Sequence, residues 1–178
     1  MSDDTPWLSR DELLAWMRFV GVLMTVPPAV DAQLRRDSCL NFFEYSVMAG
    51  LSGAPGRAMK LSALAGMSHG SQSRLSHAIS RLERAGWVVR RGVCDEPRAV
   101  EAVLTDAGFA KLADAAPAHA REVRRMVFDV LTPEQVGQLE EISRALLTVS
   151  MPEAASLMEG PASRLSNCLL YTSDAADE

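Results

Sequence analysis

Hydrogen-bonding and cationic side chains occupy one face of a predicted helix, residues 72–84. With about 100° between successive residues, the apolar side chains form a narrow stripe of Leu75, Ala78, Ile79 and Leu82. The opposite face carries Ser73, His77, Ser80 and Arg84. Serine and histidine can reach base edges at close approach, and the flanking Arg74 and Arg81 can reach phosphates. This chemistry suits duplex DNA, although any solvated amphipathic helix also has polar residues outside.

The helix has a plausible cap for its first turn. Ser71 stands at the N-cap position, where the helix N-terminus is available to a phosphate. Arg90 and Arg91 follow this helix closely in the sequence, inside a predicted strand. An arginine-rich hairpin directly after a polar helix strengthens the hypothesis of DNA contact.

Basic residues are concentrated around this helix in an otherwise acidic chain. The chain has 18 Lys+Arg against 23 Asp+Glu, a net charge of −5. Residues 57–98 hold eight basic and three acidic residues, a net charge of +5, and the remainder carries −10. Arginine outnumbers lysine sixteen to two, which favours bidentate contacts to phosphate and guanine but also arises from GC-rich coding. A basic island of this kind is the electrostatic footprint of a DNA-binding element.

The segments before this helix predict a series of helices. Residues 10–26 form a long apolar helix that Pro27-Pro28 stops or kinks. A polar link through residues 35–37 leads to a second apolar helix at residues 39–51. A turn and a short helix at residues 61–66 come next, and Gly86 ends the helix of residues 72–84.

The segments after it predict a hairpin and two more helices. Residues 87–93 and 99–105 are its two strands, and their connection contains Pro97. Thr105 caps a helix that reaches about residue 130, with a kink at Pro117. The last helix opens on a capping box with a proline in its first turn: Thr132, Pro133 and Gln135. A short helix, a second helix and a hairpin in succession indicate a winged helix-turn-helix.

The sequence also resembles a known family, the MarR family of bacterial transcriptional regulators. The resemblance rests on KLSALAGMSHGSQSRLSHAISRLERAGWVVRR and EPRAVEAVLTDAG, with FFEYSVMAGLSGAPG before and VRRMVFDVLTPEQVGQLEEI after them. It covers about residues 8–150. It implies a homodimer with interlocked terminal helices, a recognition helix at residues 71–85, and Arg98 as the wing-tip arginine of the minor groove. The family usually has Asp-x-Arg at the wing tip, whereas this chain has Glu96-Pro97-Arg98, and proline stiffens that turn.

The residue pattern and the resemblance together give a set of expected contacts and a domain plan. The expected DNA-binding residues are Ser71, Ser73, Arg74, Ser76, His77, Ser80, Arg81, Arg84, Arg90, Arg91 and Arg98. The expected fold is mainly α with a small β-hairpin wing, a winged helix-turn-helix domain flanked by N- and C-terminal dimerisation helices. Its parts are an N-terminal dimerisation helix (1–36), the winged domain (37–104), C-terminal dimerisation helices (105–160) and a tail (168–178).

Apolar faces at both ends of the chain favour dimerisation. The last helix has a heptad-like seam of Leu139, Ile142, Leu146 and Val149. The first helix has a broad apolar face of Leu13, Trp16, Met17, Val20, Leu23 and Met24. These faces could also pack within one subunit, but helices at opposite ends of a small chain would bury each other poorly.

Aromatic residues near the N-terminus are candidates for a small-molecule pocket. Trp16, Phe19, Phe42, Phe43 and Tyr45 belong to a group of six aromatics before residue 46. The family's effectors are often small aromatic or phenolic compounds bound between the dimer helices and the winged domain, which an aromatic lining would suit. Each of these residues could equally be part of the core.

Other classes of function have little support. The 178 residues suit one domain, and 48% are apolar. No apolar run nears the roughly 18–20 residues of a membrane span, so we expect no integral membrane protein. The acidic N-terminus does not look like a signal peptide, so we expect a reduced cytoplasmic protein. We find no catalytic constellation and expect no enzyme, cofactor or metal. The histidines (His69, His77, His119) and the cysteines Cys39 and Cys94 have no metal-site spacing, and the two thiols match no redox-sensor motif.

The last eleven residues, CLLYTSDAADE, resemble the translation of a transposon-type sequencing adapter. We leave them out of the fold, and without their three acids the net charge is −2. A natural, disordered acidic tail is the alternative interpretation. The function expected from the whole sequence is a ligand-responsive repressor that binds a pseudo-palindromic operator as a homodimer. A winged-helix protein-interaction module without DNA binding is the alternative.

Overall fold

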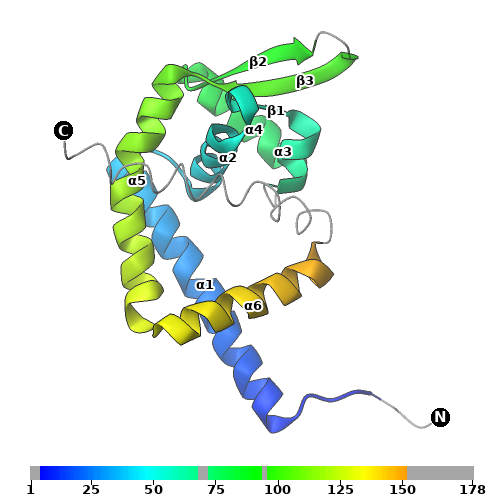
Figure 1. Cartoon of the computed structure of the whole chain (residues 1–178), viewed down its shortest axis with the longest axis vertical. Coiled ribbons are helices and arrows are strands. Elements are labelled where there is room, and N and C mark those ends of the chain that lie inside the picture. The colour runs from blue at the N-terminus through cyan, green and yellow to red at the C-terminus, as the bar shows by residue number, and fades with distance from the viewer. Residues whose placement is uncertain (1–4, 68–71, 94–95, 152–178) are drawn as a thin grey trace.

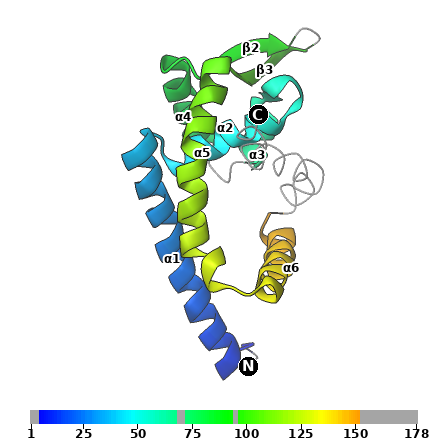
Figure 2. The same ribbon diagram turned by 60° about the vertical axis from the view of Figure 1, so that its left-hand side comes forward.

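Two long helices, α1 (Arg10–Ser38) and α5 (Asp106–Met126), pack along each other below a small winged domain (Figures 1 and 2). The computed structural model describes residues 5–67, 72–93 and 96–151, without the side chains of Met67, Pro97 and Arg98. Ser71, His69, Cys94, the tail of residues 168–178 and the side chain of Arg98 therefore lie outside the described residues. The fold is mainly α with a small antiparallel sheet, as expected.

Helix α1 is longer than the sequence predicts. It begins with a capping box in which Ser9 Oγ accepts from Glu12 N and Ser9 N donates to the Glu12 carboxylate. Pro27-Pro28 was expected to stop or kink the helix, and the stop is wrong, because the helix continues to Ser38 and contains the expected polar link. Its last turns are buried through Val30, Gln33 and Leu34, and this packing outweighs the two hydrogen bonds that the prolines remove.

Helix α1 also resembles a membrane span, which was not expected from the sequence. By length and composition alone, α1 is long and apolar enough to cross a bilayer. Only 6% of its most apolar 18-residue stretch is buried inside the chain. The expectation that no segment reaches this limit is therefore wrong for α1, because it was based on uninterrupted apolar runs. One such helix near the N-terminus is weak evidence for a membrane protein, since a helix that packs against another protein surface has the same composition.

The winged domain follows α1. Its elements are α2 (Phe42–Gly53), the 3-10 turn η1 (Pro55–Arg57), β1 (Ala58–Lys60), α3 (Leu61–Met67), α4 (Gln72–Arg84), β2 (Val88–Val93) and β3 (Glu96–Leu104). Helix α2 begins at Phe42 rather than near Cys39, because Asn41 is its N-cap and forms a capping box with Glu44. Cys39 ends α1 in a left-handed conformation, with φ 55°.

The strands form one sheet in the order β1-β3-β2. The expected hairpin is confirmed, with Val88 opposite Leu104 and Arg91 opposite Glu101. The expected placement of Pro97 in the connection is wrong, because β3 begins at Glu96 and includes Pro97. The third strand, β1, was not expected from the sequence, because three residues are too few to show an alternating pattern. It pairs with residues 101–103 of β3, so the sheet is wider than a simple hairpin.

The C-terminal segment starts at the base of the wing. Thr105 caps α5 by accepting from Gly108 N, as expected. Helix α5 ends at Met126 rather than near residue 130, and the 3-10 turn η2 (Phe128–Val130) follows it. Helix α6 (Pro133–Ser150) has the predicted capping box of Thr132 and Gln135 and lies at the end of α5 away from the sheet (Figure 1).

Candidate nucleic-acid interface

Helix α4 has the two faces that the sequence predicts. Its buried residues are Leu75, Ala78, Ile79 and Leu82, all on the predicted apolar stripe. The exposed residues are Gln72, Ser73, Arg74, Ser76, His77, Arg81 and Arg84, and Ser80 is half-buried. The helix ends as predicted, because Gly86 has φ 76° and its N–H donates to Glu83 O at 2.9 Å. A rigid helix therefore presents serine, histidine and arginine side chains to solvent.

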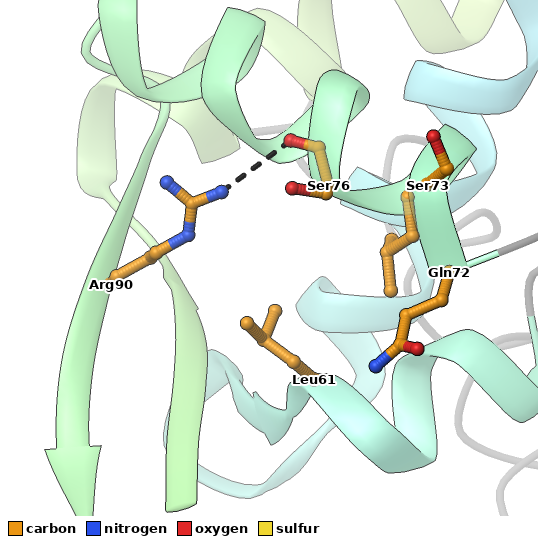
Figure 3. Close-up of a pocket in the computed structure, with 6 residues that line it drawn as sticks. Leu61, Gln72, Ser73, Ser76 and Arg90 are labelled. Atoms are coloured by element: carbon orange, nitrogen blue, oxygen red, sulfur yellow. Dashed lines mark hydrogen bonds between the residues drawn. The ribbon is translucent and has the colours of Figure 1, made fainter.

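A surface hollow lies beside the first half of this face. It has a volume of about 660 Å³ and is lined by Leu61, Gln72, Ser73, Leu75, Ser76 and Arg90. Figure 3 shows Arg90 reaching from β2 toward Ser76, whose carbonyl oxygen accepts a hydrogen bond from Arg90 Nη2 at 3.4 Å. Hydroxyl, amide and guanidinium groups thus lie together beside two leucines, between the helix and the wing.

Arg90 ties the wing to helix α4. Its guanidinium forms an ion pair with Glu83, and Nη2 also donates to Ser80 Oγ at 3.1 Å. The backbone N–H of Arg90 donates to Glu83 Oε1 at 3.1 Å. The side chain expected to approach DNA therefore contacts helix α4 itself.

Most other cations of the basic island also have acidic partners. The ion pairs are Arg57–Asp106 at 2.9 Å, Lys60–Glu96 at 2.5 Å, Arg81–Glu44 at 3.0 Å and Arg91–Glu101 at 2.6 Å. Glu44, Glu101 and Asp106 come from outside residues 57–98, so counting charge along the sequence overstated the positive charge of this surface. The cross-strand position of Glu101 opposite Arg91 could have revealed one of these pairs. No sequence signal links Glu44 to Arg81.

Arg84 and Arg74 differ from the other arginines of α4. Arg84 Nε donates to Ser80 O at 3.3 Å, and Arg84 has no ion pair among residues whose side chains the structure describes. The guanidinium carbon of Arg74 lies 4.4 Å from the centre of the Phe43 ring, a cation–π contact. Phe43 was expected in a ligand pocket, and here its ring contacts Arg74 of α4.

The remaining aromatic candidates fall into two groups. Trp16 and Phe19 lie on the exposed first half of α1 with ring centres 6.4 Å apart. Phe42 and Tyr45 of α2 lie 6.1 and 4.3 Å from the ring of His119 on α5. Burial lowers the pKa of His119. Within this one chain, the five aromatic residues do not form a single pocket.

The described residues contain no group of three or more His, Cys, Asp or Glu side chains that could hold a metal ion. Cys39 is exposed and lies at the C-terminal end of α1. It therefore ends α1 and precedes α2, rather than lying within the second helix as the expected bounds of residues 39–51 placed it.

Solved structures similar to this chain are regulators. Sco3205, a MarR family transcriptional regulator from Streptomyces coelicolor solved in complex with DNA, is 37% identical over 82% of this chain and 91% of its own, with a TM-score of 0.78. AbsC, a MarR family regulator from the same organism, is 33% identical over 80% of this chain and 98% of its own, with a TM-score of 0.73. A MarR mutant from E. coli complexed with operator DNA is 19% identical over 77% and 96%, with a TM-score of 0.65, and shows the fold alone. No protein-family model matches the chain, and no curated protein matches it.

Proposed function

Because the chain belongs to the MarR family of transcriptional regulators, we propose that it binds duplex DNA through helix α4 and the wing. The observation that carries this proposal is the exposed face of α4, where Ser73, His77 and Arg84 stand opposite a fully apolar buried stripe. Sco3205, which is 37% identical to this chain, was solved in complex with DNA. An exposed helix face of serine, histidine and arginine beside a wing is suited to contact base edges in the major groove.

Each part of the surface has a proposed role. Ser73, Ser76 and His77 contact base edges, and the N-terminus of the helix at Ser71 receives a phosphate. The positioning contacts to phosphate come from Arg74, Ser80, Arg81, Arg84, Arg90 and Arg91. Arg98 enters the minor groove from the wing tip, where a narrow groove attracts arginine.

We propose that the protein acts as a homodimer joined by α1 and α6. Helix α6 has no buried residue, and its seam residues Leu139, Ile142, Leu146 and Val149 are all exposed. The first half of α1 also exposes large apolar side chains, among them Trp16, Met17 and Met24. An apolar surface of this extent on two helices needs a partner, and a second copy can cover both faces. The resulting pair of recognition helices suits a pseudo-palindromic operator.

The regulation follows from this arrangement. A small aromatic effector that binds between the dimer helices and the winged domain, near Trp16, Phe19, Phe42, Phe43 and Tyr45, favours a spacing of the two α4 helices that no longer fits adjacent grooves. The protein then leaves its operator, so we propose a repressor that works in the cytoplasm.

Fluorescence anisotropy with the DNA directly upstream of the chain's own gene tests this function. We expect preferential binding over a scrambled duplex, with the logarithm of the association constant falling by about 0.9 per contacted phosphate for each tenfold rise in salt. Binding without preference would place the operator elsewhere. A folded dimer that binds neither duplex at low salt would refute DNA binding and favour the protein-interaction module.

A further inference from the structure

Glu44 is a charged side chain buried between α2 and the recognition helix. Glu44 is 2% exposed. The two oxygens of its carboxylate have different partners, a backbone N–H and an arginine. Glu44 Oε2 accepts from the backbone N–H of Asn41 at 3.0 Å, which completes the capping box of α2. Glu44 Oε1 lies 3.0 Å from Arg81 Nε, an ion pair although the N–H is not aligned for a hydrogen bond.

The two partners have very different exposures. The side chain of Glu44 is 3% exposed and that of Arg81 is 53% exposed. A buried carboxylate is stable only with charged or hydrogen-bonding partners. Moving Arg81 away would leave Glu44 without its cation, so the ion pair restrains the guanidinium of Arg81. A guanidinium has several N–H donors, so an ion pair at Nε does not use all of them, and the side chain of Arg81 is about half exposed to solvent.

We propose that Glu44 is a positioning residue for DNA recognition, which fixes the guanidinium of Arg81 so that its outer edge meets one phosphate of the operator. The proposal rests on the proposed DNA-binding function. Arginine is suited to this role because its planar fork holds two acceptors in a fixed geometry. Glu44 itself does not touch DNA, because it lies beneath the helix.

The proposal predicts an effect opposite to that of charge alone. Replacing Glu44 by glutamine removes a negative charge close to a polyanion, which by charge alone strengthens DNA binding. If Glu44 positions Arg81, the same substitution releases the side chain and weakens operator binding. Glutamine keeps the shape and the N3 role in a capping box, so Glu44→Gln preserves the cap of α2.

The test compares Glu44→Gln, Arg81→Gln and the double variant in the full chain. The probe is a fluorescein-labelled duplex selected from a random library by the wild-type protein, beside a scrambled duplex. We expect Glu44→Gln to weaken binding to the selected duplex about tenfold, the effect of one charge-assisted contact reduced by solvent exposure, and to weaken binding to the scrambled duplex as well, because a phosphate contact carries no sequence information. Arg81→Gln should lose as much, and Glu44→Gln should then add no further loss in the double variant.

Glu140→Gln is the matched control. Glu140 pairs with Arg144 at 2.6 Å within α6, which lies at the end of α5 away from the sheet (Figure 1), and the substitution makes the same change of charge. Circular dichroism checks that every variant is folded. If Glu44→Gln does not fold, Arg81→Gln alone is compared with the wild-type protein, because the Arg81 side chain is on the surface. If Arg81→Gln then binds the selected duplex as tightly as the wild type, the proposal is overturned.

The outcomes separate this inference from the function on which it rests. A wild-type protein that selects no duplex would refute the proposed function and this inference with it. Wild-type binding combined with unchanged or tighter binding by Glu44→Gln would overturn the inference alone. An equal loss in Glu140→Gln would also overturn it, because the effect would then come from net charge.

Discussion

Replacing Gly108 by alanine should destabilise the junction between the wing and helix α5. Gly108 lies in the first turn of α5, and its N–H donates to the cap residue Thr105 at 3.0 Å. A Cβ at this position would lie 2.9 Å from the carbonyl carbon of Trp87 and 2.8 Å from Leu104 Cδ1, and closer still to Trp87 O. Trp87 O also accepts the backbone N–H of Thr105 at 3.0 Å. The new methyl group therefore meets backbone that cannot move without breaking this junction.

The expected loss follows from these contacts. Overpacking a rigid site costs about 1–3 kcal/mol, and the cap and the Thr105–Trp87 hydrogen bond contribute about 1 kcal/mol each. The higher helix propensity of alanine offsets somewhat less than 1 kcal/mol of this loss in the free energy of unfolding. We expect the free energy of unfolding to fall by about 3 kcal/mol.

Urea unfolding followed by circular dichroism measures this change. Gly137→Ala is the matched control, because nothing lies within 4 Å of a Cβ at Gly137. In this exposed turn of α6, alanine should stabilise the protein by about 0.5–1 kcal/mol. If Gly108→Ala cost less than about 1 kcal/mol, the close approach of α5 to Trp87 would not exist in solution.

Three further outcomes are expected. Leu146→Glu places a charge in the exposed seam of α6 and should turn a dimer into a monomer in light scattering after size exclusion; a persistent dimer would remove α6 from the interface. His77→Ala should lower the ratio of operator to scrambled-duplex affinity, whereas Arg84→Gln should weaken both alike and reduce the salt slope by about 0.9; the reverse pattern would exchange their roles. Burial holds the pKa of His119 below the ordinary value of a histidine, so the folded state favours the neutral ring. The free energy of unfolding should fall as the pH drops below about 6.5, where the unfolded chain gains the proton first. His119→Phe should flatten this part of the pH profile, and an equal slope in both proteins would assign it to other groups.

Local signals predicted much of the fold. Helix α4, its apolar stripe, its terminal Gly86 and the two later caps depend on residues close together in the chain, and all are confirmed. The end of α1 was wrong because Pro27-Pro28 is a strong local signal, while the packing of Val30 and Leu34 against the winged domain is not visible locally. The strand β1 was missed for the same reason, since it exists only through its pairing with β3.

The candidate site was predictable in its residue types but not in its electrostatics. The sequence identified the serines, the histidine and the arginines of α4, because an exposed face follows from helical periodicity. It could not show that Arg81 and Arg90 are held by Glu44 and Glu83. These ion pairs depend on which elements lie close together in space, and a count of charges along the chain gives no information about that.

Those ion pairs also affect how a bound effector could act. Helix α4 is joined to α2 through Glu44–Arg81, to the wing through Arg90–Glu83, and to the core through its buried stripe. Moving α4 alone would break all three attachments, including one to a carboxylate that is stable in the interior only when it is paired. We therefore expect the winged domain to move as one unit against α1 and α5. Because Gly108 and the Thr105 cap form the close contact at that boundary, we expect the spacing of the two α4 helices in the proposed dimer to be set at the base of the wing rather than within it.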